Sequence, residues 1–283
     1  MFIAKIAVLT LISVVTCSSI FALECTQRYG TGANEIKLAT GSPGELGLVK
    51  VLAEAFSEKN NVSLCWIKAG SGVSLSYLKK KEVDMIMVHA PKAEKEAVKD
   101  GWASDRSLIG SNEFYITGPS KDPALIKDSS SAVEAYSRIA TKQALFYTRA
   151  DNSGTHKKEL SIWSKALMSP NGNWYTINKD FMLATLKKAD TTGAYFMTDS
   201  STWVAAKKEL KNLRILFRGD LMLVNTYNAL KQNGTETTQQ QLSAKFIEFV
   251  AKGEGQEIIR TFGTKLYGEA IYNDANYARK YDR

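Results

Sequence analysis

The chain has 283 residues, and 37 Lys and Arg against 29 Asp and Glu give it a formal net charge of +8. Charges of both signs are interleaved, and no dense basic block with aromatic residues occurs, so the composition argues against a nucleic-acid-binding protein. A generally positive surface instead favours anionic small ligands or an anionic membrane partner. The length suffices for one large domain or two of ordinary size.

The N-terminal segment predicts export. Residues 1–22, MFIAKIAVLTLISVVTCSSIFA, carry one charge at Lys5, followed by an apolar run and then small residues. This is the layout of a secretory signal peptide, and the apolar run is short for a membrane anchor. We therefore expect a periplasmic protein.

Two cysteines follow this segment. Cys25 lies just before the first predicted strand, and Cys65 lies within the second. In an oxidising compartment two thiols can pair, so we expect a disulfide that ties the N-terminus to the sheet. The alternative is one exposed and one buried free thiol. No metal-type spacing of Cys and His occurs, so no cation site and no cofactor are expected.

The first third of the chain alternates predicted strands and helices. Strands are expected at 35–40, 62–70 and 83–90, each followed by a helical pattern. In the helix predicted over 45–60, one face is formed by Leu48, Val49, Leu52, Ala55 and Phe56. This βαβαβ order predicts a parallel sheet whose ligand-binding loops gather at the carboxyl edge of the strands.

The middle of the chain repeats this logic in a second α/β lobe. A helix predicted over 154–168 is expected to bury Leu160, Trp163 and Leu167. Two amphipathic helices are expected within 239–263. The chain is expected to cross between the lobes near 116–119 and 214–223, which gives a first lobe of residues 23–116 plus 218–283 and a second of residues 117–217. Such a two-crossing hinge lets the lobes close on a ligand.

Four turns follow predicted strands and are rich in hydroxyl groups. They are ATGSPG (39–44), AGSGVS (69–74), TRADNSGTH (148–156) and MTDSST (197–202). Free N–H groups and the dipole at a helix N-terminus favour an anion, although for any single turn the same residues also serve as helix caps. Four such turns facing one cleft predict a small oxyanion site.

Arg149 is the only arginine in these turns, and its fork of donors suits a tetrahedral oxyanion. The alternative is an ion pair between Arg149 and Asp151. The predicted ligand-binding residues are Thr40, Ser42, Ser71, Arg149, Ser153, Thr155 and Thr198.

A secreted hydrolase that uses Asp151, His156 or Ser153 is an alternative of another class. Ser153 and His156 are close in sequence, which could indicate a nucleophile and its base. At a helix start, however, Ser153 is better placed to cap, and no GxSxG, HExxH or P-loop motif is present. The other histidine, His89, is interpreted as structural.

Several strings together resemble the tungstate-binding, TupA-type solute-binding proteins of ABC importers. They are GLVKVLAEAFSEKNNVSL, AGSG, VDMIMVHAPKAEKEAVKDG, NEFYITGPSKDPA, TRADNSGTHKKELSIW, GAYFMTD and EGQEIIRTFGTKLYGEAIY. The resemblance covers residues from about 35 to 275. It implies a type II periplasmic binding protein fold, a monomer that holds a bare tetrahedral oxyanion between its lobes, and an ABC permease as partner. By matching position, it places anion contacts on Ser42, Ser71, Arg149 and Thr155, with Ser153 and Thr198 nearby.

Two positions depart from the family pattern. The first turn of the family is a run of threonines that ends in serine, whereas Gly41 here removes one hydroxyl. After Thr-Asp the family commonly has an arginine, whereas this chain has Ser200. We expect these changes either to weaken anion binding or to alter which anion is bound.

The orientation of Asp151 and Asp199 is expected to separate tungstate or molybdate from phosphate. Tungstate, molybdate and sulfate are unprotonated dianions at neutral pH, whereas phosphate keeps a proton that a carboxylate can accept. We expect a tungstate binder, with molybdate as a further ligand. Phosphate or sulfate binding is the alternative within this class, and a sensory or adhesive protein without transport is a third.

Overall fold

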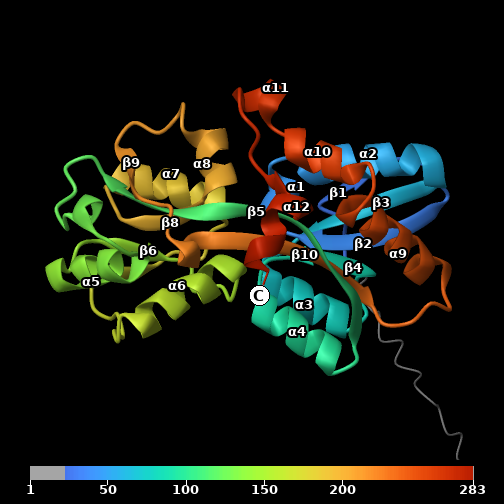
Figure 1. Cartoon of the computed structure of the whole chain (residues 1–283), viewed down its shortest axis with the longest axis horizontal. Coiled ribbons are helices and arrows are strands. Elements are labelled where there is room, and N and C mark those ends of the chain that lie inside the picture. The colour runs from blue at the N-terminus through green and yellow to red at the C-terminus, as the bar shows by residue number, and fades with distance from the viewer. Residues whose placement is uncertain (1–22, 283) are drawn as a thin grey trace, which may run out of the picture.

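The computed structural model describes residues 23–282 and consists of two α/β lobes side by side (Figure 1). The predicted signal peptide lies outside the described residues. The strands of the first lobe are β1 (Gln27–Tyr29), β2 (Asn34–Thr40), β3 (Val62–Lys68), β4 (Met85–Val88), β5 (Ala103–Pro119), β10 (Val224–Gln232) and β11 (Asn273–Asp274). Its helices are α1 (Ser42–Glu45), α2 (Leu48–Asn60), α3 (Ser71–Lys79), α4 (Pro91–Lys99), α9 (Thr238–Ala251), α10 (Gly255–Thr261), α11 (Thr264–Tyr267) and α12 (Ala275–Ala278).

The second lobe is built from the middle of the chain. Its strands are β6 (Phe146–Thr148), β7 (Tyr175–Ile177), β8 (Phe196–Asp199) and β9 (Leu213–Phe217). Its helices are α5 (Ala132–Lys142), α6 (Gly154–Lys165), α7 (Met182–Thr192) and α8 (Ser200–Ala206). Short 3₁₀ turns cover Ile126–Asp128, Leu221–Leu223 and Arg279–Tyr281.

The sheet of the first lobe confirms the predicted parallel core. Its strand order is β1-β3-β2-β4-β10-β5-β11, with β2 parallel to both β3 and β4. Thr40 pairs with Lys68, so the turns after β2 and β3 leave the sheet at the same edge. Cys25 and Cys65 form a disulfide with their Cα atoms 5.2 Å apart, which joins the N-terminal segment to β3.

Strand β5 belongs to both lobes. Its residues 103–113 pair with β10, and its residues 114–119 pair with β8 and β9. The chain crosses back between β9 and β10, so two crossings connect the lobes, as Figure 1 shows at the centre of the molecule. The earlier half of β5, ASDRSLIGS, lacks a sustained apolar alternation, and its strand conformation depends on β10 alongside it.

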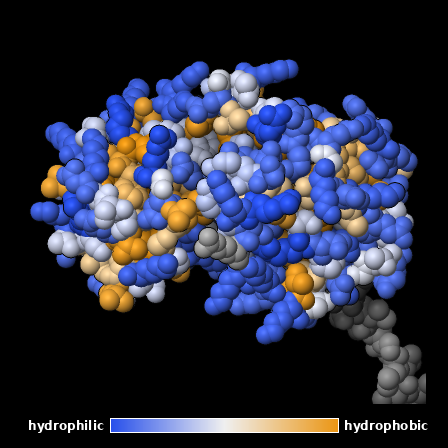
Figure 2. Space-filling view, viewed as in Figure 1, coloured by the Kyte–Doolittle hydropathy of each residue, from blue (hydrophilic) through white to orange (hydrophobic). Residues whose placement is uncertain are grey.

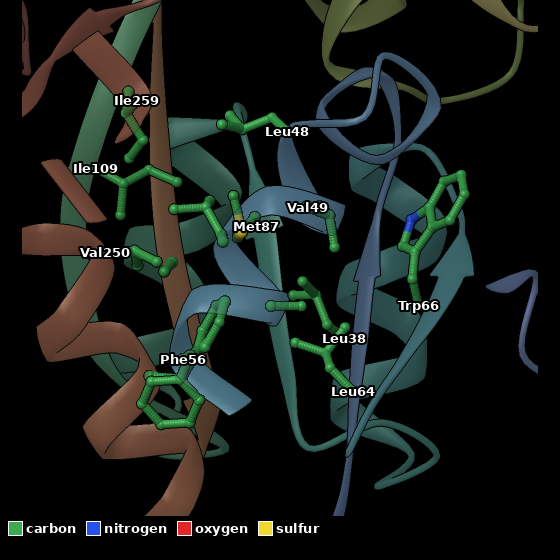
Figure 3. Packing of buried hydrophobic residues seen from close by; sticks show 14 of the residues in the cluster. Leu38, Leu48, Val49, Phe56, Leu64, Trp66, Met87, Ile109, Val250 and Ile259 are labelled. Atoms are coloured by element: carbon green, nitrogen blue, oxygen red, sulfur yellow. The ribbon is translucent and has the colours of Figure 1, made fainter. Parts of the chain in front are cut away.

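Each lobe has its own buried core. In the first lobe, α2 packs onto the sheet, and Figure 3 shows Val49 and Phe56 of α2 near Leu38 and Leu64 of β2 and β3. Phe56 also meets Phe246 of α9 edge-to-face, with ring centroids 5.2 Å apart. The predicted face of α2 is confirmed except at Ala55, which is half-buried while Ala53 is buried in its place. Full burial of a Val, Leu or Phe side chain contributes about 1.5–3 kcal/mol to the stability of the fold.

The predicted buried face of α6 was wrong at two of three residues. Leu160 is 46% exposed and Leu167 is 94% exposed, whereas Trp163 is buried. The helix ends at Lys165, before Leu167, and it buries Glu159 and Ile162, which share a face with Trp163 at i, i+3 and i+4 spacing. Glu159 is therefore buried on this helix, whereas its neighbour Leu160, which was expected to be buried, is exposed.

The surface seen in Figure 2 is mostly hydrophilic, and apolar groups gather mainly on the lobe at the left, to which α6 belongs. Within residues 23–282, no helix is long and apolar enough to cross a membrane.

Candidate anion-binding site

A small cavity lies between the lobes, and we call it the interlobe cavity. Its volume of ≈ 20 Å³ is far below the roughly 300 Å³ or more of a pocket for an organic ligand. The first lobe contributes Thr40, Gly41, Ser42, Pro43, Gly70, Ser71, Met87, His89 and Tyr227, and the second contributes Arg149, Ser153, Thr155 and Phe181. Six of the seven predicted ligand-binding residues therefore line one space, and Thr198 does not.

Two helices begin at the interlobe cavity. Helix α3 starts at Ser71 directly after β3, and α6 starts at Gly154 after β6. Ser153 is the N-cap of α6, and its Oγ accepts a hydrogen bond from the backbone N–H of His156 at 3.3 Å. Free N–H groups and the positive dipole ends of both helices therefore face the same space, which favours a negative charge there.

The hydroxyl groups around the cavity have different roles. Ser71 Oγ accepts a hydrogen bond from the backbone N–H of His89 at 3.2 Å, and Ser153 Oγ accepts one as described, so both can donate their own hydrogen to a ligand. Thr155 is 2% exposed and sits on the first turn of α6. These three hydroxyls are the strongest donor candidates.

The hydroxyls of Thr40 and Ser42 already donate hydrogen bonds within the protein. Thr40 Oγ1 donates to the carbonyl oxygen of Met87 at 2.7 Å, so its hydrogen cannot also serve a ligand. Thr40 therefore lines the cavity but holds the turn after β2 against β4, which argues against a direct hydrogen bond from its hydroxyl to a ligand. Ser42 Oγ donates to Asp199 Oδ2 over a long 3.4 Å, which a ligand can displace.

Arg149 brings the positive charge to the cavity. Its side chain is buried; Nε donates to the carbonyl oxygen of Asp180 at 3.1 Å, and Nη2 lies 2.5 Å from Asp151 Oδ2. The guanidinium also lies over the ring of Phe181, 5.6 Å from its centroid. A guanidinium has five N–H donors, so these contacts leave donors for a ligand. Arg149 therefore forms the ion pair with Asp151 and also lines the cavity, where it remains a candidate anion contact.

Thr198 lies in β8, where it pairs with Tyr115 away from the cavity wall. Its hydroxyl is 3.3 Å from the carbonyl oxygen of Asp199. The turn after β8 caps its own helix: Asp199 accepts from Thr202 N at 2.8 Å and from Ser201 Oγ at 2.6 Å. In this turn the polar residues therefore serve as a helix cap, the alternative to an anion contact.

No carboxylate among the described residues lines the interlobe cavity. Asp151 is held by Arg149 and by the backbone N–H of Ser153, whose distance to Oδ1 is 3.0 Å. Asp199 is engaged in the cap of α8 and by Ser42. The cavity therefore presents hydrogen-bond donors, without a carboxylate to accept a proton from a ligand.

Four lining residues were not predicted as part of the site: Met87, His89, Phe181 and Tyr227. Burial lowers the pKa of His89 to about 4, and Nδ1 lies 2.9 Å from Asn225 Oδ1, so the ring is neutral with its proton on Nδ1. His89 directly follows a parallel strand at the edge that carries Ser71, a signal that could have identified it. Phe181 comes from an unrelated loop, and no sequence pattern marks it.

The arrangement around Ser153 does not form a nucleophile–base pair. The ring of His156 accepts at Nδ1 from the backbone N–H of Asn152 at 3.1 Å, and among the described residues no hydrogen bond joins that ring to Ser153 Oγ. Both side chains organise the start of α6.

The two departures from the family pattern fall in different places. Gly41 lines the interlobe cavity, so a hydroxyl is absent there. Ser200 lies at the start of α8, where its Oγ is 3.4 Å from the backbone N of Glu113, and it does not line the cavity.

Comparisons with known proteins agree with this geometry. Residues 26–254 match the PBP superfamily domain. The tungstate-binding protein TupA of Peptoclostridium acidaminophilum is 30% identical over 254 residues, which are 88% of this chain and 87% of that protein. The structure of the tungstate ABC transporter from Geobacter sulfurreducens is 36% identical, with a TM-score of 0.73, and the match covers 82% of this chain and 100% of that one. The tungstate-binding protein TupA from Desulfovibrio alaskensis G20 is 33% identical, with a TM-score of 0.70, over 86% of this chain and 99% of that one. The chain belongs to the PBP superfamily and, within it, to the TupA-type solute-binding proteins of ABC transporters.

Proposed function

We propose that this protein captures a tetrahedral oxyanion, tungstate first and molybdate second, between its two lobes and delivers it to an ABC permease. The observation that carries the proposal is the interlobe cavity itself. Donors from both lobes, including Ser71, Arg149, Ser153 and Thr155, converge on a space that fits a small inorganic ion. The hydroxyl of Ser42, also in the first lobe, is a further candidate donor.

The donor set favours a fully deprotonated dianion. Hydrogen phosphate carries a proton that needs an acceptor; no carboxylate among the described residues lines the cavity, which leaves Nε2 of the neutral His89 ring as the one side-chain nitrogen there that could accept it. Asp151 and Asp199, the two acids of the turns, are turned to Arg149 and to the cap of α8. This arrangement argues against phosphate.

The protein performs no chemistry on its ligand in this proposal. Ser153 and His156 cap a helix, and the relatives named above are tungstate-binding proteins of transporters. We further propose that the protein works outside the cytoplasmic membrane as a monomer, with the permease as its partner.

Calorimetric titration of the ligand-free protein with tungstate, molybdate, sulfate, phosphate and chromate tests the proposal. Thermal unfolding should run in parallel, because a ligand at 100 times its Kd adds about 2.7 kcal/mol of stability. Tight binding of tungstate or molybdate, with weak or no phosphate binding, is expected. Phosphate as the tightest ligand would contradict the argument from the missing carboxylate, and turnover of model esters would instead favour a hydrolase.

A further inference from the structure

The interlobe cavity is enclosed by direct contact between backbone segments of the two lobes. The first turn of α3 in the first lobe faces Asn152 and Ser153 in the second, and the start of α6 in the second lobe faces His89 in the first. Lys68 of the first lobe lies over the ring of Phe181 of the second, 4.2 Å from its centroid. The lobes are therefore closed on each other in this structure.

Glycines occupy the two tightest of these contacts. A Cβ on Gly72 would lie 2.5 Å from both the backbone oxygen and Nδ2 of Asn152. A Cβ on Gly154 would lie 2.4 Å from the ring of His89 and 2.7 Å from its backbone oxygen. Because backbone atoms are among the obstacles, side-chain rotation alone cannot relieve either overlap.

The requirement for glycine at these positions is not conformational. Neither Gly72 nor Gly154 has a positive φ, so alanine is compatible with the backbone at both. Alanine also keeps the backbone N–H group that an anion at a helix N-terminus would use. The missing Cβ matters only for how closely the opposite lobe can approach.

We infer that Gly72 and Gly154 are closure determinants: they set how completely the lobes close, and through closure they set anion affinity without a side chain that touches the anion. This inference rests on the proposed function. A side chain at either position acts as a spacer, which leaves Arg149 and Thr155 of one lobe too far from Ser71 of the other for a compact ion to reach all three.

Gly70 provides an internal comparison. A Cβ there would lie 3.1 Å from Ser153 Cβ, a contact that a small shift can accommodate. The order of the contacts therefore predicts an order of effects, with Gly70→Ala milder than Gly72→Ala and Gly154→Ala.

The test measures tungstate affinity by calorimetry and compactness by small-angle scattering for wild type and the three alanine variants. We expect wild type to contract on adding tungstate. Gly72→Ala and Gly154→Ala should contract less and bind with a Kd raised about tenfold or more, because overpacking of a tight contact is costly. Gly70→Ala should raise Kd by less than about threefold.

Gly118→Ala is the matched control, because its Cβ would lie 2.5 Å from Tyr195 within a single lobe. It should lower the melting temperature of the ligand-free protein, whereas Gly72→Ala and Gly154→Ala should not. Equal affinity in all variants, a lowered ligand-free melting temperature in the two closure variants, or a wild type that does not contract would each overturn the inference. A wild type that binds none of the oxyanions would refute the proposed function and the inference with it, a result distinct from the failure of closure alone.

Discussion

Replacement of Arg149 by alanine tests the candidate site most directly. Arg149 is 5% exposed and is the only arginine that lines the interlobe cavity among the described residues, and its guanidinium is already oriented by Asp180 and Asp151. A hydrogen bond to a charged group is worth about 1.5–3 kcal/mol, so the loss of two to the anion costs about 3–6 kcal/mol. The Kd for tungstate should rise roughly 100- to 10,000-fold.

Two further variants separate charge from geometry. Arg149→Lys keeps the positive charge but loses the planar fork, and it should fall between wild type and Arg149→Ala. Arg218→Ala makes the same change of charge at an exposed residue outside the cavity and should leave affinity unchanged. Calorimetry gives Kd, and circular dichroism checks that the buried substitution leaves the fold intact. A folded Arg149→Ala variant with wild-type affinity would refute the site assignment.

Three other predictions test particular contacts. Ser71→Ala should raise Kd about tenfold, whereas Thr40→Val should change it less than about threefold, since the Thr40 hydroxyl donates to the backbone; similar losses in titrations of both variants would contradict this. Burial raises the pKa of Glu159 to about 7, so the folded state holds its proton between about pH 4.5 and 7 and stability falls as pH rises through that window. The difference in unfolding free energy between Glu159→Gln and wild type should therefore increase in favour of the variant by about 2–3 kcal/mol from pH 5 to pH 8. If denaturation at both pH values gave the same difference, ionisation of Glu159 would be excluded as the cause. Removal of the disulfide in a Cys25→Ser, Cys65→Ala variant, which opens a separation of 40 residues, should cost about 3–4 kcal/mol in denaturant unfolding, and a reductant should reproduce that loss in wild type.

The sequence predicted the framework of the site because parallel strands constrain where their turns lie. Once 35–40 and 62–70 are read as neighbouring strands, the turns with Ser42 and Ser71 must meet at one edge. The same argument applied to the second lobe places Arg149 and Thr155 opposite them. The fold, with two lobes and two crossings, was predicted on this basis and is confirmed.

The errors arise where the outcome depends on three-dimensional packing. Thr40 lines the cavity, but its hydroxyl donates to the backbone of Met87, a contact that no sequence pattern indicates. Phe181 reaches the cavity from a loop whose position no periodicity encodes. Leu160 and Leu167 were expected inside because they are apolar, but the hydrogen bonds that Tyr175 and Trp163 donate to Glu159 make a buried carboxyl acceptable on that face.

The charge balance of the site explains why closure should matter so much. Arg149 is paired with Asp151, and burial keeps His89 neutral, so the cavity wall has little net charge before a dianion arrives. The attraction then comes from the remaining N–H donors of Arg149 and from oriented dipoles: the first turns of α3 and α6 and the hydroxyls of Ser71, Ser153 and Thr155. Dipoles of this kind are strong only at short range and where water is excluded. A site that binds through dipoles therefore depends on how tightly its two halves meet.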